Sequence, residues 1–158
     1  MTELTTKTKV NVILDTNFLI DMFRFRVSFE DIEDAAGCSC EFYVTKPSVA
    51  ELEHLKNKKN KYAKVGLNFI TKGKVKILER QNSSVKERNA DEAIMSFIDS
   101  LETGFAKSPE KREATKKTIV ATNDEKLRKR IKALREKNLG IRSVRTIYLR
   151  AKKRLEIK

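Results

Sequence analysis

Four acidic residues share one kind of position in this sequence, because each lies beside the start of an expected helix. They are Asp15, Glu51, Asp91 and Asp124. Carboxylates gathered in one crevice repel one another, and their pKa values rise unless a cation neutralises them. Oxygen-only ligands of this kind suit Mg²⁺ or Mn²⁺ and do not suit zinc. The chemistry predicted for such a cluster is metal-assisted attack by water, since bound divalent ions lower the pKa of a coordinated water.

The element that would position Asp15 is an apolar run followed directly by a helical pattern. Residues 10–14 leave little polar face, which suits a strand covered on both sides in a parallel α/β sheet. Residues 118–122 form a second fully apolar strand, and Asp124 follows it. Ligands and catalytic groups collect at the carboxyl edge of open α/β sheets, so parallel pairing would bring the four acids to one edge. Capping of the next helix by Asp15 or Asn17 is the structural alternative.

The rest of the chain alternates short strands and helices, which indicates a single α/β domain over residues 1–158. We expect further strands at 42–44, 75–78 and 141–149. We expect helices at 18–25, 28–36, 49–55, 62–72, 93–101 and 126–137. The segments without a strand or helix pattern are a polar extension at 1–9, a polar loop at 81–89, a loop or short solvated helix at 103–117, and a basic tail at 150–158.

Most of the acids also have a purely structural interpretation as helix caps. Residues 48–51 and 122–125 fit the capping box, and residues 89–92 resemble it. Such caps would account for the glutamates but leave Asp91 and Asp124 needing another role, apart from a small gain from the helix dipole. Independent caps need not all lie at one sheet edge, and this favours a shared site.

The charge of the chain points to a polyanionic partner. Its 158 residues contain 35 Lys plus Arg against 22 Asp plus Glu, a formal net charge of +13. Nucleic acid is therefore the first candidate, and an acidic metal cup on a basic protein is the arrangement that a nuclease needs. Cys38 and Cys40 are too few for a zinc site. No apolar run approaches the ~20 residues of a membrane span, so we expect a cytoplasmic protein with no membrane partner.

Four stretches of the chain resemble the motifs of PIN-domain nucleases. They are Ile13-Leu14-Asp15-Thr16-Asn17, Ser48-Val49-Ala50-Glu51-Leu52, Ala90-Asp91-Glu92-Ala93-Ile94 and Ile119-Val120-Ala121-Thr122-Asn123-Asp124. The resemblance covers nearly the whole chain and implies a three-layer α/β/α fold around a central parallel sheet, with metal-dependent endonucleolytic cleavage of RNA. By that match Asp15, Glu51, Asp91 and Asp124 would carry Mg²⁺ or Mn²⁺. Asn17 would orient Asp15, and Thr122 would help to place a metal-bound water.

Within this family two groups of nucleases are similar to the chain. The segments Phe18-Leu19, Phe25-Arg26-Val27 and residues 145–150 look most like archaeal relatives of the nucleases that cleave precursor ribosomal RNA. The toxin nucleases of toxin–antitoxin pairs are the other group, and membership of it would make an antitoxin the partner. A PIN-fold assembly factor that binds ribosomal RNA without cutting it is a third alternative. A homodimer, which would place two acidic cups in one basic groove, also stays open.

The candidate RNA-binding residues fall in two short stretches of the chain. They are Arg24, Arg26, Lys56, Lys58, Lys59 and Lys61. The four lysines fit a solvated basic turn as well as they fit a patch that contacts phosphates. His54 could share a helical face with Glu51, but we favour a solvated histidine because the metal ions already activate water. Aromatic residues suited to base stacking are sparse, so we expect recognition of RNA shape and backbone.

Overall fold

The computed structural model describes residues 9–78, 89–107, 117–137, 144–150 and 154–158. Their strands form one sheet in the order β3-β2-β1-β4-β5-β6. The strands are β1 (Val10–Leu14), β2 (Cys40–Val44), β3 (Val75–Ile77), β4 (Thr118–Ala121), β5 (Val144–Arg150) and β6 (Arg154–Ile157). The first five pair in parallel, and β6 pairs antiparallel with β5. The predicted central parallel sheet is confirmed, with one antiparallel strand added at its edge.

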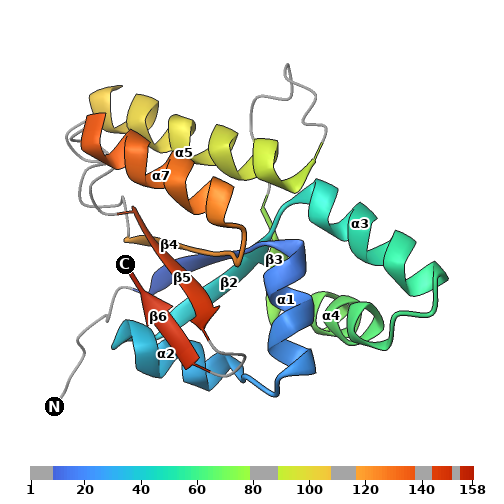
Figure 1. Ribbon diagram of the computed structural model, residues 1–158. Coiled ribbons are helices and arrows are strands. Elements are labelled where there is room, and N and C mark those ends of the chain that lie inside the picture. Colours follow the sequence, from blue (N-terminus) through green and yellow to red (C-terminus); the bar gives the residue numbers. More distant parts are fainter. Residues whose placement is uncertain (1–8, 79–88, 108–116, 138–143, 151–153) are drawn as a thin grey trace, which may run out of the picture.

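Helices cover both faces of the sheet, as the three-layer prediction requires (Figure 1). They are α1 (Thr16–Arg24), α2 (Phe29–Ala36), α3 (Lys46–Asn57), α4 (Lys61–Thr71), α5 (Ala90–Lys107) and α7 (Glu125–Lys137). The first four contribute to one hydrophobic core, in which Val12 and Leu14 of β1 also lie. Ile13 of β1 points to the other face and packs in a second core with α5 and α7. Successive strand residues face opposite sides, which explains why β1 is apolar throughout.

Helix α3 begins three residues earlier than the sequence pattern predicted. Thr45 is its N-cap, and the side chain of Thr45 accepts a hydrogen bond from the backbone N of Ser48 at 3.3 Å. Pro47 lies in the first turn, where a missing N–H costs nothing. The predicted capping box at residues 48–51 is therefore wrong, because Ser48 is already inside the helix. Glu51 lies beyond the first turn, so capping does not explain its presence.

The end of the chain is also more regular than predicted. Residues 154–157 form β6 and not a basic tail, and Leu155 and Ile157 of this strand pack against the first core. A strand of four residues gives too short an alternation to stand out from the surrounding basic residues. Helix α5 extends to residue 107, into the segment expected to be a loop or a short solvated helix. Residues 108–116 and most of the predicted loop at 81–89 lie outside the described residues. No helix within the described ranges is long and apolar enough to cross a membrane.

Candidate active site

Asp15 lies at the carboxyl end of β1 and is buried, with 5% of its surface exposed. Its backbone N donates to the carbonyl of Ala121 at 2.9 Å, which fixes it beside the end of β4. Its side-chain Oδ1 accepts from the backbone N of Thr16 at 2.9 Å, and its Oδ2 accepts from the hydroxyl of Thr122 at 2.8 Å. Although Asp15 is the N-cap of α1, a typical cap accepts from the second or third residue of the helix. Capping alone does not explain why this carboxyl is buried.

The environment of Asp15 disfavours its charged form. Burial is the largest cause and, with the nearby charges of Asp91 and Glu51, it raises the pKa of Asp15 to about 6 against the lowering effect of its hydrogen bonds. The elevated pKa marks a carboxylate that is held in a buried position and, to a smaller extent, close to other acids. Groups of this kind are typical of functional sites.

Helices α5 and α7 each bring an acid to this edge of the sheet. Asp91 lies in the first turn of α5. Asp124 precedes α7, and its Oδ1 accepts from the backbone N of Lys126 at 2.9 Å, so that Asp124 caps this helix. The pKa of Asp91 is raised by burial first, then by the charges of Asp124 and Glu51, and also by a hydrogen bond with Asp124. Arg130 opposes this shift without cancelling it.

Glu51 completes the acidic cluster, which we define as Asp15, Glu51, Asp91 and Asp124. It is half-buried on α3 and lines a cleft of about 560 Å³ together with Asn17 and the exposed His54. The charge of Glu51 acts on both Asp15 and Asp91. The four acids come from four separate parts of the chain and influence one another at one edge of the sheet, where parallel pairing was expected to bring them.

The acidic cluster offers only oxygen ligands. Within the described ranges, no group of three or more His, Cys, Asp or Glu side chains is arranged so that it could hold a metal ion in its present conformation. Mg²⁺, however, usually keeps several waters and binds through one or two carboxylates, so a closed cage of protein ligands is not required. The donor set and the uncompensated repulsion at Asp15 fit a hard divalent cation.

Thr122 and Asn17 differ in their relation to Asp15. Thr122 is fully buried, and its hydroxyl donates to Asp15 while accepting from the backbone N of Asp124 at 3.1 Å. It therefore joins two members of the acidic cluster. Asn17 is exposed on the first turn of α1 and lines the cleft beside Glu51. The hydrogen bonds of the Asp15 side chain go to Thr16 and Thr122, so in this structure Thr122 is the side chain that orients Asp15.

Sequence reasoning missed Asn123 as a positioning residue. Its Nδ2 donates to Asp21 of α1 at 2.9 Å, and its Oδ1 accepts from the backbone N of Leu149 in β5 at 2.9 Å. The side chain thus ties the loop before Asp124 to α1 and β5. Its partners are 102 and 26 residues away along the chain, and the local pattern holds no signal for contacts at such separations.

The candidate basic residues lie at different distances from the acidic cluster. Arg24 lines a second cleft, of about 470 Å³, that it shares with Asn17, Asn123 and Asp124. An ion pair with Asp21 at 3.7 Å and the ring of Tyr62, 5.7 Å from its guanidinium, hold Arg24 in place. Arg26 is exposed after α1, at φ 58°. The exposed candidate lysines lie at the end of α3, in the turn to α4 and at the start of α4: Lys56, Lys58, Lys59 and Lys61.

Comparison with known proteins decides the family. The Fcf1 family model matches residues 34–141, more than half of the chain, and this range contains Glu51, Asp91 and Asp124. The chain belongs to the Fcf1 family. It is also 30% identical over 135 residues to a protein of Methanocaldococcus jannaschii named ribonuclease VapC4, and the match covers 85% of this chain and 89% of that protein.

The three-dimensional comparison supports the same assignment for this Fcf1-family chain. Its fold is similar to that in the structure of the PIN domain endonuclease Utp24, with a TM-score of 0.65 and 19% sequence identity. The similarity covers 94% of this chain and 90% of the other. The predicted membership of the PIN-domain nucleases is thereby confirmed.

Replacing Thr122 by Val in this Fcf1-family protein should lower the free energy of unfolding by about 1 to 3 kcal/mol. Valine keeps the shape of threonine but removes the hydroxyl, so the Asp15 carboxylate and the Asp124 N–H each lose a partner. Urea denaturation in a chelating buffer measures the change. Thr122→Ser, which keeps the hydroxyl, is the control and should lose less. A Thr122→Val variant as stable as the unaltered protein would show that the two hydrogen bonds of the hydroxyl do not stabilise the fold.

Proposed function

We propose that this Fcf1-family protein is a divalent-metal-dependent endoribonuclease. The observation that carries the proposal is the burial of Asp15 at the sheet edge, where the charges of Asp91 and Glu51 oppose its ionisation. Repelling carboxylates destabilise a fold unless a ligand compensates for them. A divalent cation at this site would provide that compensation, and family membership favours its use in cutting RNA.

The proposed metal ligands are the four carboxylates of the acidic cluster. The cation, Mg²⁺ or Mn²⁺, would supply a water of lowered pKa and stabilise charge on the scissile phosphate. The hydroxyl of Thr122 donates to one oxygen of the Asp15 carboxylate and thereby fixes the orientation of that carboxylate. Thr122 also binds the backbone N of Asp124, so one buried side chain keeps two ligands in register. Asn17 borders the clefts of Glu51 and Asp124, where it can contact the RNA.

The basic residues would hold the RNA backbone against this site. Arg24 is the nearest of the candidates, because it lines the same cleft as Asp124. The exposed lysines at the turn between α3 and α4, on the same helix pair that carries Glu51, would extend the contact: Lys56, Lys58, Lys59 and Lys61. Arg26 would add to it from the end of α1. The net charge of +13 supports recognition through phosphates rather than through base edges.

For the substrate we propose a structured ribosomal RNA precursor, processed in the cytoplasm. The second candidate is a toxin-type ribonuclease with an antitoxin as partner, which the 30% identity to ribonuclease VapC4 favours. Expression of the protein in cells distinguishes the processing enzyme from the toxin. A toxin should arrest growth unless Asp15 is replaced, whereas a processing enzyme should leave growth unchanged and shorten a supplied precursor fragment at defined positions.

Cleavage assays with Glu51→Gln test the proposed activity. Gln keeps the size of the side chain but removes a charged metal ligand, so cleavage of a structured RNA with Mn²⁺ or Mg²⁺ should fall about 100-fold or more. Glu53→Gln on the exposed side of the same helix makes the same chemical change outside the acidic cluster and should stay near the unaltered rate. The chelator EDTA should stop cleavage.

Two outcomes would contradict this proposal. Equal activity of Glu51→Gln and Glu53→Gln would exclude a catalytic role for Glu51. Tight RNA binding by the unaltered protein, with no cleavage under either metal, would identify a non-cleaving assembly factor instead.

A further inference from the structure

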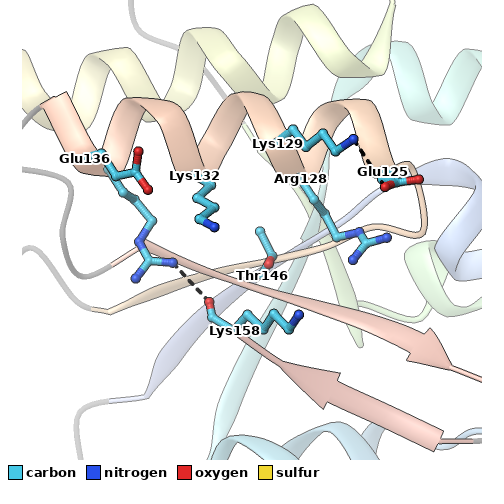
Figure 2. Close-up of a pocket in the computed structure, with 8 residues that line it drawn as sticks. Glu125, Arg128, Lys129, Lys132, Glu136, Thr146 and Lys158 are labelled. Carbon is cyan, nitrogen blue, oxygen red and sulfur yellow. Dashed lines mark hydrogen bonds and ion pairs between the residues drawn. The ribbon is translucent and has the colours of Figure 1, made fainter.

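A third cleft, of about 830 Å³, lies between α7, the strand β5 and the end of β6, and we call it the α7–β6 cleft. Figure 2 shows the side chains of Arg128 and Lys132 reaching down from α7 into it, with Lys158 on the opposite side and Thr146 at its floor. Five cations line the cleft against two acids, Glu125 and Glu136. The cations are Arg128, Lys129, Lys132, Arg135 and Lys158. A cavity with this balance of charge attracts an anion.

The protein itself neutralises only part of this positive charge. Lys129 pairs with Glu125 at 3.3 Å, and Arg135 donates to the backbone oxygen of Lys158 at 3.0 Å. Arg128 and Lys132 form no ion pair with any described residue. Their charges are therefore available to a ligand in the cleft.

Arg128 is held in place without being neutralised. Its guanidinium lies 3.9 Å from the centre of the Tyr148 ring. The hydroxyl of Tyr148 donates to Glu156 of β6 at 2.7 Å, which fixes the ring in turn. A guanidinium whose position is fixed loses less conformational entropy on binding, and its planar fork matches two oxygens of one phosphate.

Along α7, the α7–β6 cleft begins next to one member of the acidic cluster, because Glu125, which lines the cleft, directly follows Asp124 in the chain. The backbone N of Arg128 donates to the carbonyl of Asp124 at 3.1 Å, so Arg128 follows Asp124 by one helical turn. From Arg128 to Arg135 the helix advances about 10 Å along its axis, enough to face successive phosphates of one strand. We propose that the α7–β6 cleft binds the sugar-phosphate backbone of RNA that extends beyond the acidic cluster. The proposal rests on the proposed function for the identity of the polyanion.

A phosphodiester strand fits the cleft better than an acidic peptide does. Arg128 and Lys132 lie along one helix that begins beside Asp124, so a strand bound at the proposed cleavage site would meet both cations if it ran along α7. The stacked guanidinium also presents the geometry that suits a phosphate. An acidic peptide would be repelled by the carboxylates of the acidic cluster, so its binding would not be expected to extend from that cluster along α7.

Fluorescence anisotropy with a labelled RNA stem-loop in EDTA tests the proposal without cleavage. The double variant Arg128→Gln/Lys132→Gln should bind roughly tenfold more weakly, and the slope of log K against log salt should become shallower by about 1.4, as for two lost phosphate contacts. The matched control is Lys72→Gln/Lys76→Gln, which removes the same charge from two exposed lysines at and next to β3, at the opposite edge of the sheet. The control should change affinity less than about twofold, since net charge alone acts weakly at a distance.

The outcomes separate this inference from the proposed nuclease function. Equal weakening in the two double variants would overturn the inference, even if the protein cleaves RNA as proposed. A specific loss with Arg128→Gln/Lys132→Gln would support it, even if no metal promotes cleavage. Labelled oligoglutamate is the probe for an acidic peptide. If its binding requires Arg128 and Lys132 while RNA binding does not, the cleft is a peptide site and the proposal is overturned. If the double variant does not fold, Lys132→Gln alone can be tested in its place. Lys132 is exposed, so this single variant should fold and should still weaken RNA binding.

Discussion

Replacement of Asp15 by Asn should reduce RNA cleavage about 1,000-fold or more, because it removes the most buried of the four proposed metal ligands. Metal-dependent stabilisation of a phosphodiester transition state is worth several kcal/mol, and a neutral amide binds a hard divalent cation poorly. Asn has nearly the shape of Asp and fits the same two hydrogen bonds, since its oxygen accepts from Thr16 and its amide donates to the Thr122 hydroxyl. The expected loss is therefore one of chemistry and not of folding. Cleavage of a structured RNA with Mn²⁺, measured under single-turnover conditions, gives the rate.

The control for this variant is Asp34→Asn on α2. Asp34 is exposed and lies on a helix that bears no member of the acidic cluster, so its replacement makes the same change of charge elsewhere. Asp34→Asn should cleave within about threefold of the unaltered protein, and both variants should bind RNA as before. A cleavage rate for Asp15→Asn close to that of Asp34→Asn would exclude a catalytic role for Asp15.

The same Asp15→Asn variant should be more stable than the unaltered protein at neutral pH in the absence of metal. The pKa of Asp15 is raised from 3.8 to about 6, mainly by burial. The folded state thus binds its proton more tightly than the unfolded state does. As pH rises from about 4 to about 6, the unfolded chain releases this proton first, and the free energy of unfolding of the unaltered protein falls. Above that window the cost reaches about 3 kcal/mol at most, and Asn avoids it.

Thermal unfolding in EDTA at two pH values measures this effect. We expect Asp15→Asn to gain between about 1 and 3 kcal/mol at pH values above 7, a rise of several degrees in Tm. The gain should nearly vanish below about pH 4, where Asp15 is protonated in both states. A gain of the same size at both pH values would show that repacking, and not charge, causes it. No gain at neutral pH would show that the carboxylate is already compensated within the protein.

Loss of activity together with a gain of stability at one position is the pattern expected of a functional group held at a cost to the fold. Asp91 has the same character, because burial and then the charges of Asp124 and Glu51 raise its pKa as well. Asp31 at the start of α2 differs from both, because it is exposed and its side chain accepts a hydrogen bond from the backbone N of Ser28.

The buried strands, several helices and the sheet edge that carries Asp15 and Asp124 could be predicted from residue patterns. Residues 10–14 and 118–121 are mostly apolar on both faces, which favours buried strands between two layers of helices. The helical spacing of apolar residues in α2, α4 and α7 placed these helices to within a residue or two, because their amphipathic pattern is local. Acids that directly follow parallel strands lie at one edge, which accounts for Asp15 and Asp124, whereas Glu51 and Asp91 also depend on the course of α3 and α5.

The contacts that hold this edge of the sheet together could be identified from the tertiary structure but not from residue patterns. Thr122 binds Asp15 across 107 residues of chain, and Asn123 bridges α1 and β5, because the parallel strands β1 and β4 bring their ends side by side. The antiparallel β6 depends on its pairing with β5 and on the core beneath it, and it creates one wall of the α7–β6 cleft. Residue patterns report local periodicity and burial, whereas these partners are set by strand order and register. Long-range pairing leaves no local signal along the chain.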